Sequence, residues 1–215
     1  MCYNFKTSVI AFSLGLTSAA FCFVTKQYIL GMLILFYSQM QLSEAIIWKG
    51  IDSNIELLNK IGTVYGKYLL PTHLIAVGLG ILFYLPRDYR PVLIGIIFYM
   101  YVLFLYWRTD SPTLTFPECK QYRQCGDSRG RLVWPFPHDW YITLFLIIIV
   151  IAIYYIKPIK SRLLLLTFFI STLIITWIIK LRNTGSLWCF VTAILAPILV
   201  ILNYYIIKGE KDVIV

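Results

Sequence analysis

Residues 27–48 read QYILGMLILFYSQMQLSEAIIW, and this stretch decides the class of protein. It is long enough to cross a bilayer, for which a helix needs about 17–25 mainly apolar residues. Its second half nevertheless carries polar side chains, among them Gln41 and the ionisable Glu44. The stretch therefore predicts a membrane-spanning helix that contains a carboxylate.

The whole chain has the same character. Of its 215 residues, 60% are hydrophobic and only 13% are charged, about half the charged share of a typical soluble domain. The net charge of +9 comes from cations between the apolar runs, a placement typical of topology signals and lipid headgroup contacts. No zinc spacing, basic helix or phosphate-binding glycine loop points to nucleic acid. We expect a multi-pass integral membrane protein whose partner is the lipid bilayer.

The apolar runs predict an all-α integral membrane protein, a single domain over residues 1–215 with seven transmembrane helices. The expected spans are 8–25, 27–48, 68–86, 91–107, 140–157, 162–181 and 187–207.

The first span has an alternative interpretation as a signal peptide. Ser18 and Ala20 have the small −3/−1 pattern of a cleavage site. The same span carries Ala11, Gly15 and Ala19 at four-residue spacing, which is suited to close helix packing. This small-residue ladder favours a retained helix.

The connection 49–67 also has two interpretations. Ser53 and Glu56 have capping-box spacing, and the apolar residues that follow share one helical face. These features predict a short amphipathic helix in the membrane interface. The alternative is that the third span starts early, near Gly62. The apolar face consists of Leu57, Leu58, Ile61, Val64 and Tyr65.

The longest connection, 108–139, is expected to be an extramembrane loop. Cys119 and Cys125 lie in a turn-rich part of it and are spaced for a small disulfide loop, whereas no second Cys or His pair supports a metal site. The aromatic segment 134–140 favours an interfacial belt, with a lid over the bundle as the alternative. The other cysteines, Cys2, Cys22 and Cys189, are expected to be free thiols.

Two observations bear on orientation. Cations outnumber acids in the loops after spans one, three and five and in the C-terminal tail, as in cytoplasmic loops. A disulfide in 108–139 would place that loop on the outer or lumenal side. Both observations predict an N-terminus outside and a C-terminus in the cytoplasm.

The candidate site lies in the second span. Tyr37, Gln41, Glu44 and Trp48 are spaced by four, three and four residues and share one helical face. A charge within the membrane costs about 2.5–3.5 kcal/mol on insertion scales, so Glu44 is expected to face protein or water. A carboxylate near the headgroups, paired with a cation such as Lys49, is the structural alternative to a ligand-binding or proton-binding role.

His73 is the expected partner of Glu44, because the start of the third span lies on the same membrane side as the end of the second. A neighbouring carboxylate would let this histidine change charge near neutral pH. The alternative is a hydrogen bond from His73 to a backbone carbonyl. The only other histidine is His138, so no metal centre, cofactor or Ser-His-Asp set is predicted, which speaks against an enzyme.

Three features mark the seventh span. Pro197 frees the carbonyl of Ala193 and is expected to kink the helix. Asn203 is expected to make an interhelical hydrogen bond. The span contains no lysine, which excludes a retinal partner of the opsin type.

Three short motifs resemble a group of uncharacterised multi-pass membrane proteins of giant DNA viruses of algae and amoebae. They are Gln41 with Glu44, the loop sequence GRLVW at 130–134, and SLWC at 186–189. The resemblance implies no known activity. It implies that Gln41, Glu44, Trp134 and Trp188 form one site at one membrane face.

Three functions fit these observations. The first is a small-solute or ion transporter or channel with a polar outer vestibule lined by Gln41, Glu44 and His73. The second is a receptor-like protein that binds a partner through 108–139, and the third is a lipid enzyme that uses Glu44 and His73 for proton transfer. Assembly into a homo-oligomer stays open.

Overall fold

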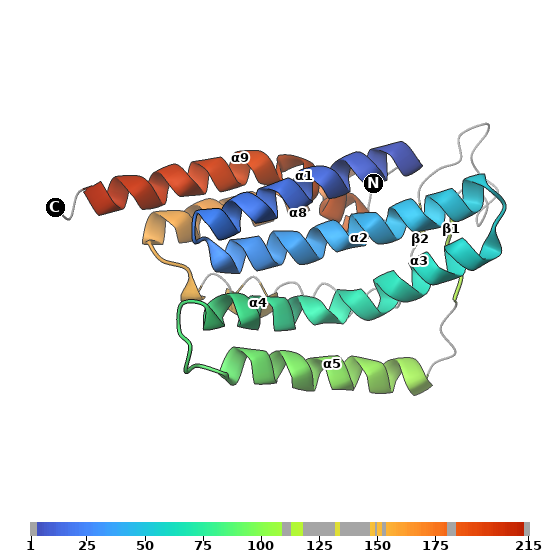
Figure 1. Cartoon of the computed structure of the whole chain (residues 1–215), viewed down its shortest axis with the longest axis horizontal. Helices are drawn as coiled ribbons and strands as arrows, with labels where there is room; N and C mark the ends of the chain where they lie inside the picture. Colours follow the sequence, from blue (N-terminus) through green and yellow to red (C-terminus); the bar gives the residue numbers. More distant parts are fainter. Residues whose placement is uncertain are drawn as a thin grey trace.

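The computed structural model describes residues 4–108, 113–117, 132–133, 147–148, 150–151, 154–179 and 184–212. Apart from one pair of two-residue strands, the described elements are helical, as expected. Figure 1 shows the long helices running side by side along one axis. The elements are α1 (Phe5–Val24), α2 (Tyr28–Asp52), α3 (Glu56–Leu69), η1 (Leu70–Thr72), α4 (His73–Leu82), α5 (Arg90–Arg108), β1 (Phe116–Pro117), β2 (Leu132–Val133), α8 (Ile159–Ile179) and α9 (Thr184–Asp212).

Four of the described helices are long and apolar enough to cross a membrane: α1, α2, α5 and the part of α9 from Val191 to Gly209. On the outer helix α5, large apolar side chains face outward, with Ile97 and Met100 both more than half exposed. Apolar surface of this extent is stable in lipid rather than in water. The chain is therefore an integral membrane protein.

The helix boundaries differ by a few residues from those expected. The first span starts earlier, at Phe5, where the Asn4 side chain accepts a hydrogen bond from the backbone N–H of Thr7 at 2.9 Å. The second span continues past Trp48 to Asp52. Polar residues at a helix end reach the headgroup region, so mean hydropathy alone does not mark where a helix stops.

A tight turn joins α1 to α2 and forces them into antiparallel contact. Lys26 has a φ of 62°, in the left-handed region. Tyr84, beyond the end of α4, fixes this turn: its hydroxyl donates to the carbonyl of Lys26 and accepts from the N–H of Tyr28. The turn and the end of α4 therefore lie at the same end of the bundle.

The third span is longer than expected. Helix α3 leads into η1 and then α4, so that 56–82 form one column beside α2 (Figure 1). Pro71 lies in η1, where it has no N–H for an α-helical hydrogen bond. The short helix predicted in the connection 49–67 is present as α3, and it continues through η1 into α4 as the alternative of an early start expected.

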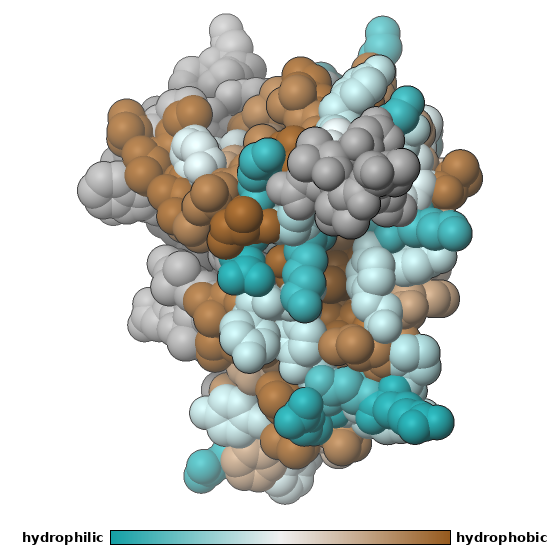
Figure 2. Space-filling model, turned by 90° about the vertical axis from the view of Figure 1, so that its left-hand side faces the viewer, coloured by the Kyte–Doolittle hydropathy of each residue, from teal (hydrophilic) through white to brown (hydrophobic). Residues whose placement is uncertain are grey.

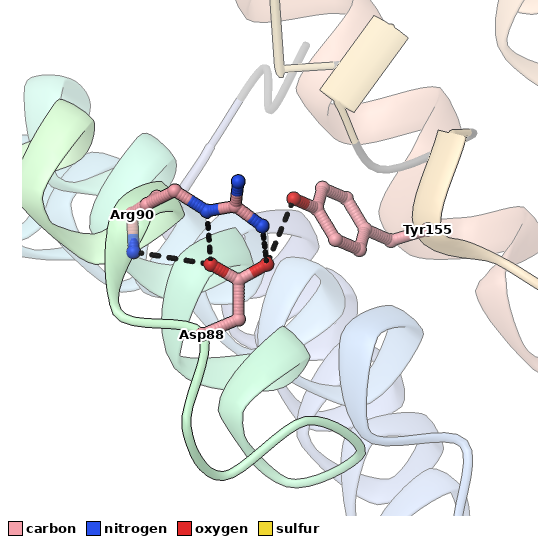
Figure 3. A network of polar contacts seen from close by, with 3 residues as sticks. All are labelled: Asp88, Arg90 and Tyr155. Carbon is pink, nitrogen blue, oxygen red and sulfur yellow. Dashed lines mark hydrogen bonds and ion pairs between the residues drawn. The ribbon is translucent and has the colours of Figure 1, made fainter.

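One end of the bundle holds the α1–α2 turn, the α4–α5 loop, the start of α8 and the end of α9; we call it the C-terminal end (Figure 1). There Asp88 accepts from Arg90 Nε at 2.8 Å and from the Tyr155 hydroxyl at 3.2 Å (Figure 3). The Arg90 guanidinium, followed by the tyrosine hydroxyl, holds the pKa of the Asp88 carboxyl below its usual range. This contact ties the α4–α5 loop to the segment before α8.

The opposite end, which we call the hairpin end, holds the α2–α3 turn and the strand pair. Strands β1 and β2 are antiparallel, with Phe116 opposite Val133. The Asn59 side chain on α3 pairs with both backbone groups of Thr115, donating to its carbonyl at 2.7 Å and accepting from its N–H at 3.0 Å. Part of the loop 108–139 is thus bound to the helices. Cys119, Cys125 and their predicted disulfide lie outside the described residues.

Candidate functional site

Helix α2 is the central helix of the described bundle. In the most apolar 18-residue stretch of α2, 72% of the residues are buried. The corresponding stretches of α1, α5 and α9 have 33%, 22% and 33% of their residues buried. Side chains on α2 therefore face protein on nearly all sides. The expectation that Glu44 faces protein rather than lipid is confirmed, because its side chain is only 1% exposed.

The buried side chains of α2 include a continuous series of polar groups in its second half, which we call the α2 polar row. Its members are Tyr37, Ser38, Gln41, Ser43, Glu44 and Trp48. Each of these side chains is at most 4% exposed.

Close helix contacts position the row. On one side α1 approaches so closely that a Cβ on Gly15 would lie 2.6 Å from Cβ of Ser38. Gly15 is buried together with Ala11 and Ala19, which confirms the small-residue ladder. On the other side Ser43 donates to the carbonyl of Gly62 on α3 at 2.7 Å.

His73 lies beside Tyr37. Its Nδ1 is 2.7 Å from the carbonyl of Leu70, and since a carbonyl only accepts, Nδ1 carries the proton in this contact. The imidazole packs edge-on against the Tyr37 ring, with centroids 4.9 Å apart. The alternative stated for His73, a hydrogen bond to a backbone carbonyl, is confirmed.

The described contacts place His73 beside Tyr37, and Glu44 follows Tyr37 by seven residues, about two turns of α2. The expected pairing of His73 with Glu44 stays a prediction.

The row faces α4, α8 and α9. At one end of the row the Tyr37 ring lies 6.5 Å from the Phe169 ring of α8. At the other end Trp48 belongs to an apolar cluster with Ala193 of α9 and Leu132 of β2. Leu132 is 1% exposed, so the strand pair inserts an apolar side chain next to Trp48. The hairpin end of the row is thus lined by apolar side chains.

The remaining predicted residues lie in α9 or in the long loop. Pro197 lies inside α9, and Ala193 one turn earlier is buried. Asn203 donates to Oε1 of Gln27 at 2.5 Å, which confirms its interhelical hydrogen bond. The side chain of Trp188 and all of Trp134 lie outside the described residues, so their predicted place beside Glu44 stays a prediction.

Lys67 and Gln27 are among the buried polar side chains that the sequence analysis missed. Lys67 on α3 is 7% exposed, and its Nζ lies 4.6 Å from the ring centroid of Tyr106 on α5. Gln27 immediately precedes α2 and is buried against α9, where it contacts Asn203. Lys67 was overlooked because its segment was expected to lie at the interface. Gln27 was overlooked because it lies in a turn and its partner, Asn203, is 176 residues away in the sequence.

The site thus offers carboxylate, amide, hydroxyl and imidazole groups inside a membrane bundle. Such groups bind ions, protons or small polar solutes. No cluster of three or more His, Cys, Asp or Glu suited to a metal occurs within the part of the chain that the structure describes. The free thiol expected at Cys22 is confirmed and buried in the core.

Comparisons with protein-family models, with curated proteins and with solved structures gave no match. The resemblance to membrane proteins of giant DNA viruses therefore stays a prediction.

Proposed function

We propose that this membrane protein moves an ion or a small polar solute across the bilayer, and that the α2 polar row contacts the substrate. The observation that carries the proposal is the burial of Gln41 and Glu44 in the most enclosed spanning helix. An ionisable side chain within a membrane is costly to insert and typically marks a substrate or proton pathway.

We extend the proposal to a bundle of seven spans. The described residues support it: β1 and β2 lie at the hairpin end, whereas Tyr155 lies at the C-terminal end beside Asp88. The chain between β2 and Tyr155 connects these two ends. The column 56–82, this connection and α8 are the three spans that we add to the four long apolar helices.

The proposed orientation has the C-terminal end in the cytoplasm. The turns and helix ends there carry several cations and few acids, the pattern of cytoplasmic loops. Those cations include Lys26, Arg87, Arg90, Lys157, Lys160 and Arg162. The hairpin end then faces outward.

A flux measurement tests the transport proposal. The purified full-length protein is reconstituted into liposomes, and a pH-sensitive dye inside reports proton movement under imposed H⁺, Na⁺, K⁺ and Cl⁻ gradients. We expect one of these gradients to drive flux above that of empty liposomes. Glu44→Gln is expected to abolish the proton-linked part of the flux, since the side-chain amide of glutamine does not take up or release a proton.

Glu56→Gln is the matched control, because Glu56 is an exposed carboxylate in the first turn of α3. It is expected to leave the flux unchanged. The proposal is wrong if the wild-type protein carries no more than empty liposomes, or if Glu44→Gln carries as much as Glu56→Gln.

A further inference from the structure

A second polar site lies at the C-terminal end, away from the α2 polar row. It is a cavity of about 480 Å³ between the α1–α2 turn, the end of α4, residues 154–157, α8 and α9. Its volume falls within the range of small-molecule sites. Figure 2 looks onto this end and shows hydrophilic side chains with apolar atoms visible between them.

Two buried amides line the cavity, Gln27 and Asn203, which are 2% and 3% exposed. Gln27 accepts from Asn203 and donates to the hydroxyl of Thr25 at 2.8 Å. Among the described residues, Oδ1 of Asn203 has no hydrogen-bond donor. A buried amide oxygen in this state favours a ligand that brings a hydroxyl or an ammonium group.

Two cations also line the cavity. Arg162 donates to the carbonyls of Tyr154 and Ile156 at 3.3 Å, which fixes its guanidinium at the cavity wall. Lys157 lines it as well. The ion pair of Asp88 in the described structure is with Arg90, and neither Lys157 nor Arg162 has a carboxylate partner there. The wall therefore carries an excess of positive charge.

The rest of the lining is mostly apolar, including Ile29, Leu30, Ile81 and Leu165. A ligand that fits this surface needs a negative group for the cations, a donor for Asn203 and an apolar part. A phospholipid has all three when its headgroup is anionic and hydroxylated. Basic pockets between transmembrane helices at the cytoplasmic side bind such headgroups.

We infer that this cavity binds the headgroup of an anionic, hydroxylated phospholipid from the adjoining leaflet. Lys157 and Arg162 contact the phosphate, and a headgroup hydroxyl donates to Oδ1 of Asn203. The apolar wall accommodates the upper part of an acyl chain. This site is independent of the proposed transport through the α2 polar row.

Lipid titration of the full-length protein in detergent, followed by native mass spectrometry, tests the inference. Phosphatidylglycerol is the probe, and phosphatidylcholine, which has no headgroup hydroxyl and no net charge, is the reference lipid. We expect the Kd for phosphatidylglycerol to be at least about tenfold lower, the size of effect that one charge-assisted contact supplies. Equal binding of the two lipids would overturn the inference.

Variants locate the binding. The double variant Lys157→Gln/Arg162→Gln is expected to raise the Kd for phosphatidylglycerol about tenfold or more. Arg162 also holds backbone carbonyls, so Lys157→Gln alone, which removes no hydrogen bond of the described structure, is the second variant and is expected to act in the same direction. Arg87→Gln, an exposed cation in the same end of the bundle, is the control. If Lys157→Gln and the double variant both bind like Arg87→Gln, the site is elsewhere.

A further arm distinguishes a lipid from a free anion. Inorganic phosphate at millimolar concentration is added in place of the lipid, and the thermal unfolding midpoint is measured. We expect phosphatidylglycerol to raise the midpoint and inorganic phosphate to leave it unchanged. An equal rise with inorganic phosphate would show that the ligand is a free anion, which contradicts the lipid assignment.

Discussion

Both ends of α2 bury polar side chains, but they pack them differently. In its second half, the α2 polar row is enclosed by direct helix contacts, as where Ser43 meets Gly62 and Ser38 meets Gly15. At its start, Gln27 borders a cavity of about 480 Å³. A change in the enclosed half cannot be relieved by water or lipid, whereas a change at the cavity can. The two halves are therefore expected to differ in how much a substitution costs.

The largest effect is expected for Gly62→Val. A Cβ at this position would lie 2.6 Å from Cγ1 of Ile47, 2.9 Å from the carbonyl of Ser43 and 3.0 Å from the N–H nitrogen of Ile47. Two of these atoms are backbone and cannot rotate away, so α3 must separate from α2. We expect a loss of about 3 kcal/mol in the free energy of unfolding. Thermal unfolding in detergent measures it.

Gly209→Ala is the matched control, because no atom lies within 4 Å of a Cβ built at Gly209. Alanine in an exposed helix is expected to gain up to about 1 kcal/mol over glycine. Equal stability of Gly62→Val and Gly209→Ala would contradict the close contact of α3 with α2 at Gly62.

The second effect is expected for Asn59→Leu at the hairpin end. Asn59 is the buried side chain that pairs with both backbone groups of Thr115. Leucine has a similar size but leaves that donor and acceptor without a protein partner, at a cost of about 2 kcal/mol. Hydrogen exchange of the Thr115 amide is expected to accelerate. Lys60→Ala, an exposed neighbour, should leave this exchange rate unchanged; acceleration in both variants would contradict the assigned role of Asn59.

A smaller effect is expected at the cavity. A double-mutant cycle with Gln27→Leu and Asn203→Leu measures the coupling of their hydrogen bond. Interhelical hydrogen bonds in membranes average about 0.6 kcal/mol, and water or a headgroup in the cavity can replace the lost partner. We expect a coupling free energy near that value from unfolding in detergent. A coupling free energy as large as the stability loss expected for Asn59→Leu would contradict the expectation that substitutions cost less at the cavity than in the enclosed half.

Helical periodicity was sufficient to predict the parts of the site that lie on single helices. The spacing of Tyr37, Gln41, Glu44 and Trp48 places them on one face, and their burial was expected because a carboxylate avoids lipid. The backbone hydrogen bond of His73 was one of two stated alternatives. Its depth beside Tyr37 was not predicted, because the start of the third helix was placed too late.

Helix α3 shows why periodicity alone did not predict which face of a helix packs against its neighbour. Its apolar face was expected to lie in the interface, but Leu57 and Ile61 are 65% and 47% exposed on a helix that packs beside α2. The buried face carries Asn59 and Thr63 instead. In a membrane bundle the apolar face of an outer helix contacts lipid, so small and polar residues can form the helix contact. Contacts between distant parts of the chain, such as Leu132 with Trp48, left no local signal in the sequence.

The smallest effect is expected at Asp88, outside both halves of α2. Its pKa is held below the usual value of about 3.9 by Arg90 and by the Tyr155 hydroxyl. The ionised carboxyl therefore stabilises the fold above about pH 4, and this contribution is lost as the pH falls through the lowered pKa.

Tyr155→Phe removes the hydroxyl, so we expect the pKa of Asp88 to rise toward its usual value and the acid-induced loss of stability to begin at higher pH. Unfolding midpoints measured across pH 2–6 test this, with Tyr154→Phe as the control because Tyr154 is 72% exposed. Identical pH profiles for the two variants would mean that the Tyr155 contact does not hold the α4–α5 loop.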